Sequence, residues 1–272
     1  MIKSIKRIKL ILFTIIISFG VMSFINVWAG FTPSPPALNA KNIKRKGTII
    51  LQFENYVGEE VPVILDTSVG YFNKFNQPYT ISKLKYYIGN IYLKRKDGTK
   101  TPFSYDNYFL VDEENNASKK IESDAIIEDE YTSISFSIGV DSLHNCSGAQ
   151  SGALDPMNGM FWAWNTGYIF FKLEGNSPVS QSPGKLLEYH IGGYKEPNNC
   201  LRTITLYFKD STFFADYKET RTIRIKADIS KLFNATNKID FSKISSVTDY
   251  QNATMIADNY KDMFSVISIE DK

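Results

Sequence analysis

Residues 131–141 read YTSISFSIGVD, and from Ser133 to Ile138 polar and apolar residues alternate without a break. Ile134, Phe136 and Ile138 therefore fall on one face of an extended chain, because successive side chains of a β-strand point to opposite faces of the sheet. Alternation with a period of two is typical of a strand that is buried on one side. The stretch predicts a core strand.

Eight further stretches are rich in β-branched and aromatic residues, which favour strands. These stretches are 47–58, 61–72, 79–100, 107–114, 167–175, 185–194, 201–208 and 220–230. Lys96–Thr99 reads KDGT, which indicates a tight hairpin turn. Helical patterns are few and short, at 81–88 and 252–266. The sequence therefore predicts an all-β fold, a sandwich or barrel of eight or more mostly antiparallel strands with few short helices.

The first 29 residues have the pattern of a signal peptide. Four basic residues precede an apolar run over 10–27, and Val27 and Ala29 stand at the −3 and −1 positions of a cleavage site before Gly30. An uncleaved anchor is the alternative, since the run is nearly long enough to span a bilayer. Residues 30–46 contain three prolines and predict a linker, so that the domain would occupy 47–272. We expect a periplasmic or secreted protein.

The charge balance argues against nucleic acid as a partner. The chain has 31 basic and 29 acidic residues, and loss of the four basic residues of the signal leaves 27 basic residues. A nucleic-acid-binding surface would need a basic excess. GxSxG, HExxH, P-loop and Rossmann motifs do not occur in the sequence. These features favour a binding protein over an enzyme.

The chain has only two histidines and two cysteines, and they occur in two pairs. His144 and Cys146 follow the strand predicted at 131–141, while His190 precedes Cys200 by ten residues. Imidazole is the commonest metal ligand in proteins, so both histidines are candidate ligands, although two unrelated histidines would give the same pattern. In an exported chain two cysteines favour a disulfide, Cys146–Cys200. The alternative is a thiolate ligand in a His₂Cys copper centre with a weak methionine, for which Met157 and Met160 are candidates.

The segment around 153–175 is unusually aromatic. It reads ALDPMNGMFWAWNTGYIFFKLEG and contains Trp162 and Trp164, two of the three tryptophans. Large aromatic residues are usually buried for their apolar area, so this segment is also consistent with ordinary core packing.

Together with SKLKYYIGNIYL (82–93), YFLVDEE (108–114) and HIGGY (190–194), this segment resembles the copper-binding MbnP-like domain family over roughly residues 47–230. The resemblance implies an exported β-sandwich that binds copper through histidines, which would be His144 and His190. It also implies that a tryptophan oxidised to kynurenine contributes to the site, and either Trp162 or Trp164 matches. Relatives often have a histidine in a segment like F-x-H-x-V-G, and Asn55 stands at that position here.

Two hypotheses about function follow. The first is a copper-binding or copper-handling protein of the cell envelope. The second is a metal-free β-sandwich module that binds a partner protein, which the abundant aromatic residues favour because such residues are enriched at protein interfaces.

Overall fold

The stretch quoted first forms β10 (Asp129–Ile138), and its alternate residues are buried as predicted. The structure is a computed structural model that describes residues 45–162, 167–209 and 212–271. The predicted signal peptide lies outside these residues, as do residues 30–44 of the predicted linker and Trp164. Described residues after position 44 belong to one compact unit, in which β1 begins at Lys46.

Two large sheets contain most of the strands. The first sheet contains β18 (Phe264–Asp271), β16 (Thr220–Asp228), β1 (Lys46–Val57), β2 (Val61–Pro62), β8 (Lys120–Glu122) and β9 (Ile126–Ile127). The second contains β14 (Arg202–Tyr207), β10, β5 (Lys83–Arg95), β12 (Gly167–Asn176), β13 (Leu186–Gly192) and β17 (Ser246–Val247), with β6 (Lys100–Pro102), β7 (Tyr108–Asp112), β11 (Phe161–Trp162) and β15 (Phe213–Ala215) paired to them. A small third sheet consists of β3 (Asp66–Phe72) and β4 (Pro78–Ile81).

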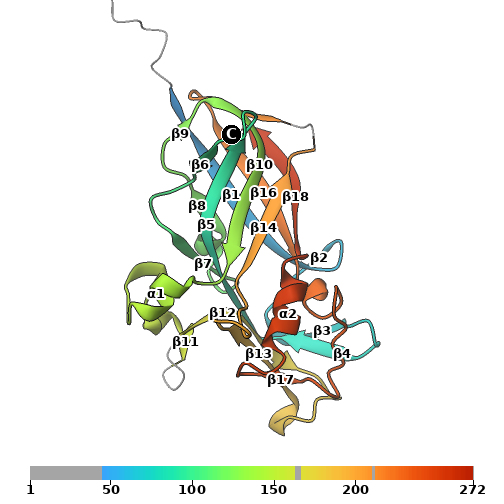
Figure 1. The fold of residues 1–272 in the computed structure, drawn as a ribbon. Helices are drawn as coiled ribbons and strands as arrows, with labels where there is room; N and C mark the ends of the chain where they lie inside the picture. Colours follow the sequence, from blue (N-terminus) through green and yellow to red (C-terminus); the bar gives the residue numbers. More distant parts are fainter. Residues whose placement is uncertain (1–44, 163–166, 210–211, 272) are drawn as a thin grey trace, which may run out of the picture. The chain divides into compact units, whose positions relative to one another are not determined.

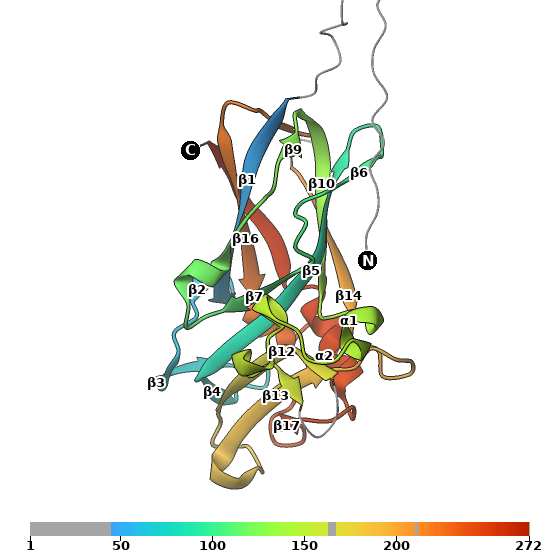
Figure 2. The same ribbon diagram turned by 90° about the vertical axis from the view of Figure 1, so that its left-hand side faces the viewer.

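The two large sheets pack face to face, as Figures 1 and 2 show for β1 and β16 on one side and β5 and β10 on the other. Phe53 of β1 meets Phe136 of β10 with ring centroids 5.7 Å apart, and Phe264 of β18 meets Tyr86 of β5 at 6.0 Å. These rings are buried at the centre of the core. The all-β sandwich is confirmed, and most of its pairs are antiparallel; β1 pairs in parallel with β16, and β13 with β17.

The helix expected over 81–88 is wrong. Residues 83–95 form the long strand β5, whose central position in its sheet buries Tyr86, Tyr87 and Ile88 in succession. Burial on both faces removes the clean alternation that marks a strand, so the apolar spacing also fits a helix. The turn predicted at Lys96–Thr99 does connect β5 to β6, with Gly98 at a φ of +89°.

Helices are short in the described part of the chain. The two α-helices are α1 (Ser142–Cys146) and α2 (Ala253–Tyr260), and short 3₁₀ turns are η2 (Asn116–Lys119), η3 (Gly152–Leu154), η4 (Pro156–Asn158), η5 (Pro183–Lys185) and η6 (Ile229–Leu232). The helix expected over 252–266 thus ends early, and β18 begins at Phe264. None of the helices described is long and apolar enough to cross a bilayer.

Candidate functional site

His144 lies in α1, immediately after β10, and its imidazole is held by a carboxylate. Asp141 is the N-cap of this helix: its Oδ1 accepts a hydrogen bond from the backbone N–H of His144 at 3.0 Å and lies 3.0 Å from the imidazole Nδ1. The hydroxyl of Tyr108, at the start of β7, donates to Asp141 Oδ2 at 2.6 Å. Three side chains, from β7, from the N-cap of α1 and from α1 itself, therefore form one hydrogen-bonded chain.

The charges in this chain follow from burial and hydrogen bonding. Burial by itself would raise the pKa of Asp141, but hydrogen bonds from Tyr108 and from the backbone and ring of His144 outweigh it and lower that pKa below its ordinary value. Burial raises the pKa of Tyr108, and the hydrogen bond to Asp141 adds to this effect. Asp141 therefore stays a carboxylate and Tyr108 a protonated donor at neutral pH, which fixes the direction of the hydrogen bond.

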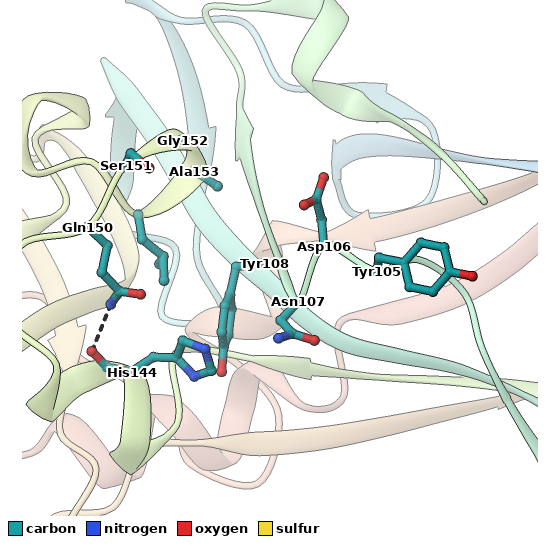
Figure 3. A pocket seen from close by; sticks show the side chains of 10 residues that line it. Tyr105, Asp106, Asn107, Tyr108, His144, Gln150, Ser151, Gly152 and Ala153 are labelled. Carbon is teal, nitrogen blue, oxygen red and sulfur yellow. Dashed lines mark hydrogen bonds between the residues drawn. The ribbon is translucent and has the colours of Figure 1, made fainter. Parts of the chain in front are cut away.

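The imidazole of His144 faces a surface pocket of about 370 Å³ (Figure 3). The ring packs edge-on against Tyr108, with centroids 4.8 Å apart, and Gln150 Nε2 donates to the backbone carbonyl of His144 at 2.9 Å. The pocket is lined by Tyr105, Asp106, Asn107, Tyr108, His144, Gln150, Ser151, Gly152, Ala153 and Leu154. Because Asp141 engages Nδ1, Nε2 is the ring nitrogen left without a partner in the described residues.

His190 has different surroundings, on β13. Its Nε2 lies 2.8 Å from Oε1 of Glu174 on the neighbouring strand β12. Two ammonium groups also approach that carboxylate, Lys83 at 3.7 Å and Lys172 at 3.8 Å. The hydrogen bond with His190 is the main reason that the pKa of Glu174 falls to about 2, and the two lysines lower it further. His190 thus shares one carboxylate with two lysine ammonium groups.

This cluster predicts a pH dependence of stability. The folded-state pKa of Glu174 lies below its ordinary value of 4.5, so its stabilising contribution is complete above pH 4.5 and is lost as the pH falls towards 2. Because solvent screens a partly exposed ion pair, we expect this contribution to be about 1 kcal/mol. Denaturation at several pH values should show that Glu174→Gln removes it, whereas Glu122→Gln, on the exposed face of β8, should not. An equal loss in both variants would contradict the assignment.

The structure does not bring the two histidines into one site. They lie on different elements and pair with different carboxylates, and His190 is not among the residues that line the His144 pocket. Within residues 45–162, 167–209 and 212–271, no three histidine, cysteine, aspartate or glutamate side chains are grouped so that they could hold a metal ion. Neither histidine therefore belongs to a three-ligand group of the described residues.

Asn55, at the position where the resemblance implies a histidine, lies in the core on β1. Its Oδ1 accepts from the hydroxyl of Tyr86 at 2.8 Å, and its Nδ2 donates to Glu113 Oε2 at 2.7 Å. Lys119 donates to the other oxygen of Glu113 at 2.8 Å. The amide thus completes a chain of polar side chains, which satisfies groups that would be costly to bury alone.

The predicted Cys146–Cys200 disulfide is not present: both cysteines are free thiols. Cys146 is exposed, and its Sγ donates to the hydroxyl of Tyr194 at 3.5 Å, so the His144 segment does contact the segment after His190, but without a covalent bond. Cys200 is buried beside Asn198, whose carbonyl accepts from its Sγ at 3.5 Å. Burial raises the pKa of the Cys200 thiol to about 12, which disfavours a thiolate ligand.

The remaining candidates from the aromatic segment divide between surface and core. Met157 is 90% exposed, whereas Met160 is fully buried. Trp162 is buried and packs edge-on against Tyr250 at 6.2 Å; it also lies so close to Gly192 that a Cβ there would come within 2.7 Å of its ring. Trp162 is therefore a core residue.

Sequence reasoning did not identify the partners of the two histidines. Asp141 could have been predicted as a partner of His144 from the local sequence. An aspartate three residues before a histidine at a helix start is an N-cap that can also reach the imidazole. Tyr108 could not have been predicted from the local sequence, because it approaches His144 only through the pairing of β5 with both β7 and β10. Glu174 becomes a neighbour of His190 only through the β12–β13 pairing.

The fold and the His144 pocket define a β-sandwich protein with a carboxylate-held histidine at a surface pocket. The family model for MbnP matches residues 46–255, and the chain belongs to the MbnP family. MbnP from Methylosinus trichosporium has a similar solved structure, with a TM-score of 0.51 and 15% sequence identity over 84% of this chain and 99% of that chain. At this identity the likeness is one of fold. Comparison with curated proteins finds no significant match.

Proposed function

We propose that this MbnP-family chain is an exported copper-handling protein of the cell envelope, rather than an enzyme, and that His144 is its copper-contacting residue. The signal-peptide pattern supports export, and the resemblance to copper-binding relatives supports the metal. The observation that carries the proposal is the Tyr108–Asp141–His144 chain, which leaves Nε2 of the imidazole open at a surface pocket.

This arrangement suits a metal-binding histidine. Ligating histidines usually donate their second ring N–H to a carboxylate or carbonyl, which fixes the tautomer and the orientation of the ring. In the tautomer that directs Nδ1–H to Asp141, Nε2 carries the lone pair that a metal ion would use. Tyr108 in turn fixes the carboxylate. A bound copper ion would provide Lewis-acid or redox chemistry, and this chain's part is to orient one imidazole donor.

His190 suits a cation less well. Its carboxylate partner Glu174 is already shared with Lys83 and Lys172, so a metal ion there would be placed among positive charges. In contrast, no lysine or arginine lines the His144 pocket. We therefore assign the copper contact to His144, and a single imidazole favours weak, exchangeable binding over permanent storage.

Titration of the purified protein with Cu(I) and Cu(II) tests this assignment. We expect one copper ion per chain, with the affinity reduced at least tenfold in His144→Ala. Asp141→Asn should weaken binding by about 10–100-fold, the usual effect of removing the partner of a ligating histidine. His190→Ala is the matched control and should bind like the unaltered protein. No copper uptake, or equal uptake by His144→Ala, would refute the proposal.

A metal-free module that binds a partner protein is the second candidate. Two observations favour it: the described residues contain no three-ligand group, and the Asn55 amide is committed to Tyr86 and Glu113. Metal analysis of the protein purified from its native host separates the two candidates. Copper bound at close to one ion per chain, either on purification or when copper is added back to the purified protein, supports the first candidate, whereas protein that takes up no added copper and co-purifies with a defined partner supports the second.

A further inference from the structure

An apolar groove of about 540 Å³ lies at the β2–β3 end of the domain, apart from the residues of the His144 pocket. This volume lies within the range of about 300–1,000 Å³ that is usual for small-molecule sites. The groove is lined by Val57, Gly58, Val61, Val69, Gly70, Tyr71, Phe72, Asn73, Lys74, Ser230 and Asn234. Figure 1 shows β2, β3 and β4 together at this end.

Several apolar side chains in and beside the walls of the groove are exposed to solvent. Phe72 is 62% exposed and Val61 is 50% exposed, and Ile64 and Phe75 in the same segment are also exposed. Clustered exposed apolar side chains mark binding sites more often than scattered ones do. The hydroxyl of Tyr71 accepts from the backbone N–H of Ile64 at 2.8 Å, which ties the segment after β2 to β3 and fixes the two walls.

Two lysines approach each other beside the groove. Lys74 lines the groove, and Lys238, which is not a lining residue, forms a β-bridge with the lining residue Asn234. Asn73 Nδ2 donates to the carbonyl of Ile239 at 3.2 Å and so holds the two segments against each other. Contact with the Lys238 ammonium, and repulsion between the two charges, lower the pKa of Lys74. Neither lysine has a carboxylate partner in the described part of the chain.

We infer that this groove binds a fatty carboxylate, with its hydrocarbon chain against Val61, Val69 and Phe72 and its carboxylate between Lys74 and Lys238. An anion at that end would relieve the repulsion between the two ammonium groups. A hydrocarbon chain suits Val61, Val69 and Phe72 better than a peptide does, because a peptide would place polar N–H and C=O groups against these apolar side chains. This site is independent of the proposed copper contact.

Calorimetric titration of the metal-free protein with octanoate, decanoate and dodecanoate, below their micelle concentrations, tests the inference. Affinity should rise by up to about fourfold for each added methylene that the groove buries. Dodecanol, which has the same chain without the charge, should bind at least fivefold more weakly than dodecanoate, and acetate should not bind. No binding of dodecanoate, or equal affinity for dodecanol, would overturn the inference, as would binding of an apolar peptide in place of dodecanoate.

Three surface variants locate the site without disturbing the core. Lys74→Ala/Lys238→Ala should weaken dodecanoate binding at least fivefold and leave dodecanol binding unchanged. Phe72→Ser should weaken the binding of both, and Lys100→Ala, an exposed lysine on β6, should affect neither. Dodecanoate binding that survives both the double-lysine variant and Phe72→Ser would place the ligand elsewhere and refute the inference.

Discussion

Replacing Phe53 with alanine is expected to lower the free energy of unfolding by about 3–5 kcal/mol. Phe53 is fully buried on β1, and its ring lies 5.7 Å from Phe136 and 6.4 Å from both Tyr86 and Phe264, edge-on in each case. It therefore joins the first sheet to β5 and β10 of the second. Alanine would leave a cavity at the point where the two sheets meet, and the surrounding strands can collapse into it only in part.

Chemical denaturation measures this effect, and two further variants test its cause. Phe53→Leu keeps most of the volume and should cost less than about 1.5 kcal/mol. Phe214→Ala, on β15, removes a ring that is 46% exposed and should cost less than Phe53→Ala. A loss below about 1 kcal/mol for Phe53→Ala would mean that the contact between the sheets contributes little to stability.

Most of the strands could be predicted because their signal is local. Alternation over 47–58 and 131–141 appears in the structure as β1 and β10, with Phe53 and Phe136 on their inner faces. The signal was ambiguous at β5: 79–100 was predicted as a strand, but 81–88 also fitted a helix, because pairing with β10 on one side and β12 on the other buries both faces of β5. Strands that are distant in sequence, and not the local pattern, determine that these residues form a strand.

For the same reason, the sequence could not predict which distant strands pair with each other. β1 pairs in parallel with β16, so that Thr48 lies opposite Thr220, and no local pattern selects that partner.

The residues of the candidate site could also be predicted only in part. The sequence identified His144 and His190 as the residues with metal-binding chemistry, but each owes its environment to a carboxylate whose role the fold determines, Asp141 and Glu174. The sequence also suggested a disulfide, and the fold instead exposes one thiol and buries the other.

Replacing Asn55 with leucine is expected to lower the free energy of unfolding by about 2–4 kcal/mol. The fully buried hydroxyl of Tyr86 would lose its acceptor, and Glu113 would lose one of its two side-chain donors. Burial raises the pKa of Tyr86 well above its usual value, so the hydroxyl cannot ionise to escape the penalty. Denaturation of the single variant should be compared with that of Asn55→Leu/Tyr86→Phe, which has no orphaned hydroxyl. The second substitution should restore at least about 1 kcal/mol, because coupled buried groups are non-additive.

The same variant separates the stability of the fold from copper binding. Asn55 contacts Tyr86 and Glu113 inside the sandwich, whereas the Nε2 atom of His144 faces a surface pocket that Asn55 does not line. If His144 is the copper contact, Asn55→Leu should be less stable and yet bind copper with unchanged affinity under conditions where it is fully folded. A fall in affinity of tenfold or more in the folded variant would show that position 55 contributes to the metal site. The amide would then have to be regarded as part of that site, in addition to its role in the buried network.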